Sequence, residues 1–269
     1  MSGEHHPEWV IDPDIPSVAR MYDYYLGGKD NYAADRAAAD QVVAAMPSVL
    51  EFTRANRRLL SRAVTMMAGQ GVRQFLDIGS GLPTQENVHE VAQRAAPDAR
   101  VVYVDNDPIV LAHARALLAN NPLTTVVQAD LREPEGIIGH PEITSRIDFD
   151  EPVGLLLLAI LHFIPDGDRP AGIVAGLRAA LAPGGYLAIT HGHRGTITRD
   201  VEDQVRSAYG RTGAGDLIPR GVDEVAEVFA GTELVGSGLV QVADWRADDA
   251  PVQSDMASPG FLAGVGRVL

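Results

Sequence analysis

Residues 75–84, FLDIGSGLPT, form a short apolar run that contains an acid, Asp77, and continues into a turn with two glycines. Gly79 and Gly81 have no Cβ and tolerate positive φ angles, so the chain can leave the strand sharply and pass close to a ligand. This pattern predicts the first strand of a nucleoside-binding α/β domain, followed by its ligand-binding loop.

A second apolar run, residues 101–105, VVYVD, also ends in a carboxylate. Asp105 follows Gly81 by 24 positions, which is the kind of spacing that separates a glycine loop from the end of the next parallel strand. A carboxylate at that strand end can accept hydrogen bonds from both hydroxyls of a ribose. The two runs together predict a bound nucleoside.

The loop also indicates which class of nucleoside is bound. Dinucleotide sites have the pattern G-x-G-x-x-G, in which the third glycine lets the N-terminus of a helix approach a pyrophosphate. Thr84 stands where that third glycine is expected, and Asp77 would repel a pyrophosphate. The sequence therefore disfavours NAD and FAD as ligands. An NAD-dependent oxidoreductase is the least favoured of three functional hypotheses for this chain.

A resemblance to a known family rests on three stretches: residues 19–31, ARMYDYYLGGKDN, residues 74–84, and residues 103–108, YVDNDP. Together they resemble the class I S-adenosylmethionine-dependent methyltransferases and, more narrowly, an actinobacterial methyltransferase family catalogued as a domain of unknown function. The resemblance covers almost the whole chain and implies S-adenosyl-L-methionine as the cofactor. Pro83 replaces a glycine of the family's pattern, and proline suits the first turn of a helix.

Short apolar runs alternate with helical stretches from residue 72 onward, which is the pattern of a doubly wound α/β fold. The predicted strands are 74–78, 100–104, 125–129, 153–160 and 186–190, with further strand-like segments at 239–243 and 261–268. The resemblance implies that they form a mostly parallel seven-stranded sheet in the order 3-2-1-4-5-7-6, with an antiparallel pair at one edge.

Residues 1–70 show no strand alternation and are expected to form an N-terminal helical lobe. We expect a Rossmann-like methyltransferase domain at 71–269, with a helical insertion at 191–232. The predicted helices are 17–27, 30–45, 48–68, 85–95, 108–119, 170–181, 198–209 and 222–230. The lobe and the insertion are expected to form the pocket for the methyl acceptor.

Open α/β sheets bind ligands beyond the carboxyl ends of their strands. There the resemblance implies that Asp105 holds the ribose, Asp130 accepts a hydrogen bond from the adenine amino group, and Asp77 lies near the cofactor's ammonium. The other implied cofactor contacts are Gly79, Ser80 and Gly81 along the methionyl and ribose portion, Asn106 next to Asp105, and the backbone of Leu131 at the ring edge. Each acid alone has a structural alternative as a helix or turn cap, but three at successive strand ends favour cofactor binding.

A histidine follows the fourth predicted strand, and two more follow the fifth. Methyl transfer from a sulfonium depends largely on positioning, but a poor nucleophile needs a base to take its proton. His162 is the predicted catalytic residue for that step, with a structural hydrogen-bonding role as the alternative. His191 and His193 suggest a metal triad with it, but no acid follows at a fixed ligand spacing, so we predict no metal site.

The segment 22–31, YDYYLGGKDN, is the least ordinary part of the lobe. Its three tyrosines cannot all face one side of a helix. We expect this turn to fold over the cofactor as a lid, with Tyr22 or Tyr25 on the methionyl side and Lys29 facing the carboxylate. The alternative for each tyrosine is packing against the sheet. A phosphate loop is excluded because Asp30 replaces the required Ser or Thr.

Composition narrows the classes of partner for this chain of 269 residues. It has no cysteine, which excludes disulfides, thiolate metal sites and a cysteine nucleophile, and its net charge of −14 disfavours nucleic acid. The N-terminus does not look like a secretory signal, and the longest apolar run, 153–161, is far short of the roughly 20 residues that span a bilayer. We expect a cytoplasmic protein without a membrane partner; its oligomeric state is not predicted.

The function predicted from the sequence is S-adenosylmethionine-dependent methyl transfer to an unidentified small molecule. A second hypothesis comes from another class: a regulator or pseudoenzyme that binds S-adenosylmethionine in the same crevice and transfers nothing. The two differ in whether a labelled methyl group reaches any product. The sequence does not identify the acceptor.

Overall fold

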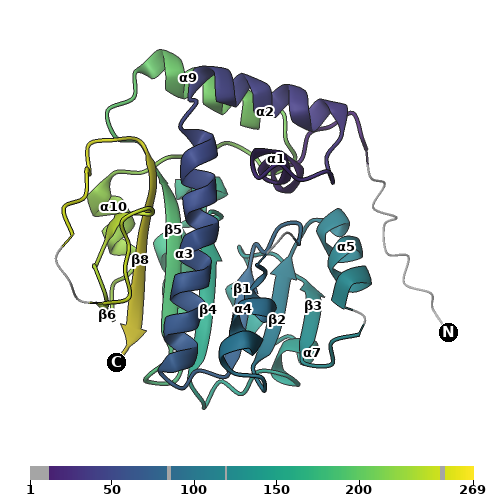
Figure 1. Cartoon of the computed structure of the whole chain (residues 1–269), viewed down its shortest axis with the longest axis vertical. Coiled ribbons are helices and arrows are strands. Elements are labelled where there is room, and N and C mark those ends of the chain that lie inside the picture. The colour runs from purple at the N-terminus through teal and green to yellow at the C-terminus, as the bar shows by residue number, and fades with distance from the viewer. Residues whose placement is uncertain (1–11, 84–85, 119, 249–251) are drawn as a thin grey trace.

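The computed structural model describes residues 12–83, 86–118, 120–248 and 252–269. A central sheet has helices on both faces, and a layer of helices covers the carboxyl ends of its parallel strands (Figure 1). The strands are β1 (Gln74–Ile78), β2 (Arg100–Asp105), β3 (Thr124–Gln128), β4 (Val153–Leu158), β5 (Tyr186–His193), β6 (Thr232–Leu234), β7 (Val240–Gln241) and β8 (Gly260–Val268). Their order is β3-β2-β1-β4-β5-β8-β6, and β7 also pairs with β8. The predicted doubly wound α/β fold is confirmed.

Helices flank these strands along the chain. They are α1 (Val18–Tyr25), α2 (Ala33–Ala45), α3 (Val49–Gly69), α4 (Val88–Ala95), α5 (Pro108–Leu118), α6 (Pro134–Ile138), α7 (Pro141–Thr144), α8 (Pro170–Ala179), α9 (Arg199–Tyr209) and α10 (Val222–Glu227), with 3-10 turns η1 (Leu161–Phe163) and η2 (Asp166–Asp168). The one-turn helices α6 and α7 were not predicted, because a single turn is too short to show a helical period. The predicted start of the fourth helix, at residue 85, lies outside the described residues.

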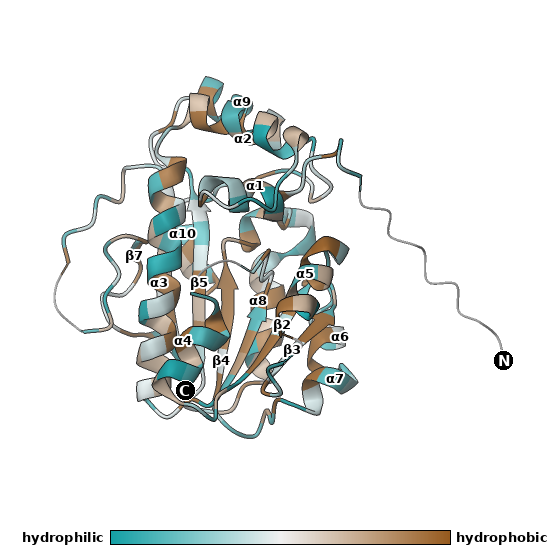
Figure 2. Cartoon of the chain, turned by 45° about the vertical axis from the view of Figure 1, so that its right-hand side comes forward, coloured by the Kyte–Doolittle hydropathy of each residue, from teal (hydrophilic) through white to brown (hydrophobic). Residues whose placement is uncertain are grey.

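The parallel strands are apolar because both faces of the sheet are covered. Every residue of β1 is buried, and so is every residue of β4 except its last, Leu158. Figure 2 shows β4 in brown, whereas α2 and α9 alternate between brown and teal. Near-continuous apolar runs of this kind are typical of parallel strands buried on both faces. Parallel pairing of β1 with β2 and with β4 places the carboxyl ends of these three strands at one edge of the sheet.

The outer edge of the sheet differs from the prediction in its details. The predicted strand at 239–243 is reduced to the two residues of β7, and a strand that was not predicted, β6, pairs with the far end of β8. Both short strands are antiparallel to β8, which is itself antiparallel to β5. Two of the three residues of β6 are exposed, so its sequence carries no burial pattern that could reveal it.

The ends of β4 and β5 also differ from the prediction, and both differences affect the site. β4 stops at Leu158 because Ala159 adopts a positive φ of 57° and turns the chain into η1. β5 continues three residues beyond its predicted end, because its pairing with β8 runs on through His191 opposite Leu262 and His193 opposite Gly260. The two histidines therefore lie within a strand, not after it.

The N-terminal helices are fixed to the carboxyl edge of the sheet. Ser17 Oγ donates a hydrogen bond of 2.9 Å to Asp107 Oδ2 just after β2, and Ala19 packs against a small cluster that contains Leu82 and Ile109. α2 packs against α9 above this edge, while α3 runs down the face of the sheet (Figure 1). α3 also shares its hydrophobic core with the strands. The division of the chain at residue 70 stays a prediction.

Candidate functional site

The turn after β1 has the conformation that its glycines were expected to allow. Gly79 and Gly81 have φ angles of 74° and 64°. A Cβ on Gly79 would lie 2.6 Å from the side chain of Ile160, whereas a Cβ on Gly81 would meet nothing within 4 Å. Gly79 is therefore needed for packing against the chain after β4, and the backbone beside Gly81 is open to a ligand.

Asp105 joins this turn to the end of β2. Its Oδ2 accepts a hydrogen bond of 2.9 Å from the Gly81 amide, and its Oδ1 accepts one of 2.9 Å from the Asp107 amide. Burial raises the pKa of Asp105 to about 6, although these backbone donors favour the charged form. Each carboxylate oxygen retains a second lone pair. Asp105 can thus hold the glycine turn and still accept hydrogen bonds from a diol.

A small cavity of about 20 Å³ lies beside the turn, lined among others by Asp77, Ser80 and Arg57. Burial raises the pKa of Asp77 to about 7; the Arg57 charge opposes the shift, and that of Asp105 adds to it. The hydroxyl of Ser80 is buried and has no hydrogen-bond partner among the described residues. This orphaned hydroxyl and the open backbone at Gly81 fit a polar ligand such as the predicted nucleoside cofactor.

Asp130, Asn106 and Leu131 lie at the ends of β2 and β3, as predicted. Arg132 Nε donates to both oxygens of Asp130, at 3.0 and 3.1 Å, and this pairing lowers the pKa of Asp130. Leu131 is buried in the core below the sheet edge, whereas the side chain of Asn106 is exposed and also bonds to Asp130. The carboxylate of Asp130 therefore already has cationic and amide partners, and its contact with adenine stays a prediction.

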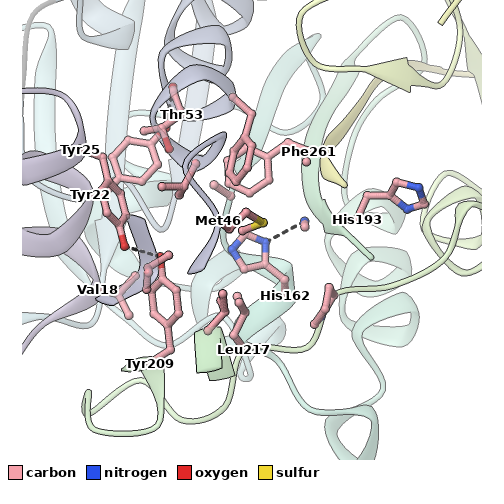
Figure 3. A pocket seen from close by; sticks show the side chains of 18 of the residues that line it. Val18, Tyr22, Tyr25, Met46, Thr53, His162, His193, Tyr209, Leu217 and Phe261 are labelled. Carbon is pink, nitrogen blue, oxygen red and sulfur yellow. Dashed lines mark hydrogen bonds between the residues drawn. The ribbon is translucent and has the colours of Figure 1, made fainter. Parts of the chain in front are cut away.

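A second, larger cavity of about 70 Å³ lies under the layer formed by α1, α2 and α9. Six aromatic residues from distant parts of the chain line it (Figure 3): Tyr22, Tyr25, Phe52, Phe163, Tyr209 and Phe261. The polar side chains that reach it are Thr53, His162, His193 and Glu202. Of the side chains predicted to lie at the site, this cavity contains His162, Tyr22 and Tyr25, while Ser80 and Gly81 of the glycine turn line the smaller one.

His162 lies within the aromatic cavity and is almost fully buried. The backbone amide of Gly192 donates a hydrogen bond of 3.1 Å to its Nδ1, and its ring stacks on Phe261 with centroids 5.5 Å apart. Burial lowers its pKa well below the usual range, and the charges of His191 and Arg220 lower it further. The structure places His162 where an acceptor could bind and keeps its ring neutral; its catalytic role stays a prediction.

Arg220 holds the turn that carries His162, and sequence reasoning missed it. Its guanidinium donates to the carbonyl oxygens of Leu161 and Ile164, at 3.2 and 2.9 Å, and to Asp166 at 2.6 Å. It also donates to Nε2 of His191 at 2.9 Å, and burial lowers the pKa of that histidine to about 4. A lone arginine after a glycine-rich link has no sequence signal that marks it as the centre of such a network.

The turn at residues 22–31 is organised by a buried acid that was not singled out. Oδ2 of Asp23 accepts hydrogen bonds from the Asp30 amide at 3.0 Å and from Asn31 Nδ2 at 2.8 Å. A Cβ on Gly28 would overlap Asp23 Oδ1, so the second glycine of the pair is required by this packing. Lys29 projects from the turn as an exposed side chain. Its contact with the cofactor and the closing of the turn as a lid stay predictions.

The three tyrosines of this turn diverge, which is what their spacing predicts. Tyr22 accepts a hydrogen bond of 2.9 Å from Asn56 on α3, and the Tyr25 hydroxyl lies 3.2 Å from that of Tyr209 (Figure 3). Tyr24 instead donates to Asp40 at the surface, at 2.9 Å. Two tyrosines thus face the aromatic cavity, and one faces solvent.

Within the described ranges, no group of three or more histidine or acidic side chains is arranged to hold a metal ion. Helices in the same ranges are all too short or too polar to cross a bilayer.

Comparison with solved structures gives two close neighbours. A candidate methyltransferase from Thermobifida fusca YX is 42% identical with a TM-score of 0.87, covering 98% of this chain and 99% of that chain. A DUF574 family protein from Streptomyces avermitilis MA-4680 is 40% identical with a TM-score of 0.87, covering 97% and 100%. A SAM-dependent methyltransferase from Anabaena variabilis, at 18% identity and a TM-score of 0.50 over 74% and 78%, shows the fold alone.

The comparisons by sequence agree with this picture. No protein of curated function matches the chain. The sequence profile described as S-adenosyl methyltransferase matches residues 4–269. This match and the two close structural neighbours confirm the resemblance inferred from residues 19–31, 74–84 and 103–108. The chain therefore belongs to the S-adenosyl methyltransferase family and is a SAM-dependent methyltransferase.

Proposed function

We propose that this methyltransferase binds S-adenosylmethionine beside the glycine turn and transfers its methyl group to a small molecule held in the aromatic cavity. The observation that carries the proposal is the position of the two cavities along one helix. Thr53 of α3 lines the aromatic cavity, and Arg57, one turn further on, lines the cavity of the glycine turn. The donor and acceptor sites of a methyl transfer must be neighbours in this way, because the reacting atoms have to meet in line.

On the donor side, the groups that would hold the cofactor are those at the ends of β1–β3. Asp105 is oriented to accept from the ribose hydroxyls, and the orphaned Ser80 hydroxyl supplies a further polar contact. Asp77 would face the ammonium, and Asp130, still carrying Arg132, would face the adenine amino group. When bound, the cofactor supplies a methyl group on a positively charged sulfur.

On the acceptor side, enclosure supports a small molecule. The cavity is covered by α1, α2 and α9, and the helices α2 and α9 come from the two parts of the chain expected to form the acceptor pocket. A folded protein or a nucleic acid duplex could not reach an atom beneath this layer. The exposed Lys29 and the adjoining turn would close over the donor side when the cofactor enters.

Two experiments test this function. Isothermal titration calorimetry is expected to show binding of S-adenosylmethionine and no binding of NAD; the reverse would overturn the choice of cofactor. Incubation with methyl-labelled S-adenosylmethionine and a cell extract should then yield a labelled small molecule. If the cofactor binds and no label is transferred to any molecule in the extract, the regulator hypothesis replaces the enzyme.

A further inference from the structure

We propose that the acceptor is a largely apolar molecule with an aromatic ring, and that His162 binds one of its hydrogen-bond-accepting atoms through Nε2–H. His162 then acts as a hydrogen-bond donor that positions the acceptor, not as a base. This inference rests on the proposed function, since it concerns the acceptor side of the same site.

The lining of the aromatic cavity selects the class of molecule. Phe52 packs on Phe261 with centroids 4.7 Å apart, and Phe163 on Tyr209 at 5.6 Å, so ring faces and edges surround the space. Rings of this kind bind another planar ring by offset stacking or edge-to-face contact. Among the described residues that line the cavity, none is a lysine or arginine, and Glu202 is the one acid. Phosphorylated or carboxylated acceptors would therefore lack a lysine or arginine partner among these residues.

The size of the cavity fits a small ring. A single water needs about 10–15 Å³ of such space. The roughly 70 Å³ present holds the equivalent of about five waters. A substituted benzene fits this space with little rearrangement, whereas a sugar would leave most of its hydroxyls against apolar walls, at a cost of about 1–3 kcal/mol for each buried group.

The hydrogen bond from Gly192 determines which nitrogen of His162 carries the proton. A backbone amide can only donate, so Nδ1 must be the acceptor. A neutral imidazole has one N–H, and it is therefore on Nε2. If Nδ1 were protonated, its N–H would point at the N–H of Gly192, and two buried donors would face each other without an acceptor. The ring is thus fixed as the neutral Nε2–H tautomer.

The Nε2–H group of His162 is available to a ligand. Among the described residues no side chain or carbonyl oxygen bonds to it, and the residue lines the cavity. In Figure 3 the hydrogen bond of the His162 ring is drawn on one side, and the other ring nitrogen lies on the side towards Tyr25 and Tyr209. Because His162 lines the cavity, a ligand there that accepts a hydrogen bond from this N–H gains affinity.

The other polar side chains of the cavity already have partners within the protein or are held in their neutral form. Glu202 is paired with Arg206 at 3.2 Å, and the two ring nitrogens of His193 face the carbonyl oxygens of Arg220 and Met256 at 3.0 and 2.9 Å. Burial raises the pKa of Tyr209 to about 12, and that of Tyr22 also rises. The cavity is therefore built to hold an acceptor that needs no proton removed by the chain.

Two fluorinated probes of the same shape test the hydrogen bond. 4-Fluoroacetophenone has a carbonyl oxygen where 4-fluoro-α-methylstyrene has a CH₂ group, and ¹⁹F NMR titration gives a dissociation constant for each with no cofactor present. The quantity of interest is the preference for the ketone, the ratio of the alkene's constant to the ketone's. Because this ratio compares two ligands on one protein, a general loss of stability does not alter it.

Two variants of His162 separate its two nitrogens. His162→Asn keeps an acceptor for the Gly192 amide and loses the distal N–H; His162→Gln keeps a distal N–H and loses the acceptor. The preference for the ketone should fall about three- to tenfold in His162→Asn and stay within about twofold of wild type in His162→Gln. His113→Asn, outside the cavity, is the matched control and should leave it unchanged.

Three results would overturn the proposal: an unchanged preference in His162→Asn, a loss in His162→Gln but not in His162→Asn, or binding of 2-fluoro-2-deoxyglucose as tight as that of the ketone. None of them depends on the donor side. Failure of S-adenosylmethionine binding would contradict the proposed function without changing the probe result. A negative probe result would contradict the inference about His162 without changing the result for S-adenosylmethionine binding.

Discussion

The crevice beside the glycine turn, where we propose that the cofactor binds, and the aromatic cavity lie along the same helix, α3, but are built in different ways. The crevice depends on backbone conformation at the ends of two neighbouring strands: a turn at Gly79 and Gly81, tied to Asp105 by one hydrogen bond of 2.9 Å. The cavity depends on side chains from α1, α9 and β8 that meet only in the folded chain. One site is specified locally and the other by tertiary packing.

Burial acts on the titratable groups of both regions in the same direction, towards the neutral form. It raises the pKa of Asp77 to about 7 and of Asp105 to about 6 in the crevice, and it lowers the pKa of His162 in the cavity. In the crevice, a bound cofactor with a positive charge would draw the acids back to their charged form. The described lining of the cavity contains no lysine or arginine, which is why we assign it a largely apolar acceptor.

The largest expected effect separates the two glycines of the crevice. Gly79→Ala should destabilise the protein by about 3 kcal/mol, because positive φ strain adds to the clash with Ile160. Gly81→Ala introduces the positive φ strain without a clash and should lower the free energy of unfolding by about 1 kcal/mol. Denaturant unfolding measures both. Equal losses would show that Ile160 moves away freely and that Gly79 has no packing role.

The next effect tests Asp105 as the ribose-binding group. Asp105→Ala should weaken S-adenosylmethionine binding about 10- to 100-fold, because a carboxylate hydrogen bond contributes about 1.5–3 kcal/mol. Calorimetry measures the affinity. Asp98→Ala is the matched control, since Asp98 is an exposed acid paired only loosely with Arg73 at 3.4 Å. Similar affinities for the two variants would remove Asp105 from the cofactor site.

The pKa of Asp77 predicts how stability depends on pH. Because its folded pKa, about 7, lies above its unfolded value, the folded state holds a proton that the unfolded state has lost, so stability falls as pH rises from about 4 to 7. Asp77→Asn cannot ionise, so this loss of stability with rising pH should disappear. At pH 8 the variant should exceed the wild type in free energy of unfolding by about 2 kcal/mol. Thermal unfolding at pH 5 and pH 8 checks it. A variant with the wild-type pH dependence would mean that Asp77 is charged in the folded protein.

The smallest expected effect concerns the turn above the crevice. Lys29→Ala should weaken cofactor binding only about two- to fivefold, since an exposed ion pair contributes less than about 1 kcal/mol, and should leave Tm unchanged because Lys29 is exposed. Calorimetry and thermal unfolding measure the two quantities. Unchanged affinity with unchanged Tm would take Lys29 out of the site.

The same contrast explains what the sequence could predict. Asp77, the two glycines and Asp105 were identifiable because a βαβ unit brings strand ends together by a fixed geometry. Tyr209 was not, because its hydroxyl meets that of Tyr25 across 184 positions of sequence. Arg220 was missed for the same reason.

The errors at the strand ends also have a tertiary cause. His191 and His193 were placed after β5 because nothing in their own sequence shows that β8 pairs with them. β6 was missed because it is short and exposed at the sheet edge. The sequence thus predicts the sheet and the conformation of the turn after β1. Of the side chains that line the aromatic cavity, it singles out Tyr22, Tyr25, His162 and His193.

The central claim is that the crevice holds the donor and opens towards the aromatic cavity that holds the acceptor. A crystal structure of the protein with S-adenosylhomocysteine tests it most directly. We predict the ribose hydroxyls on the Asp105 carboxylate and the sulfur directed past Tyr22 towards His162. A ribose bound away from Asp105, or a sulfur directed to a surface other than the aromatic cavity, would contradict the account.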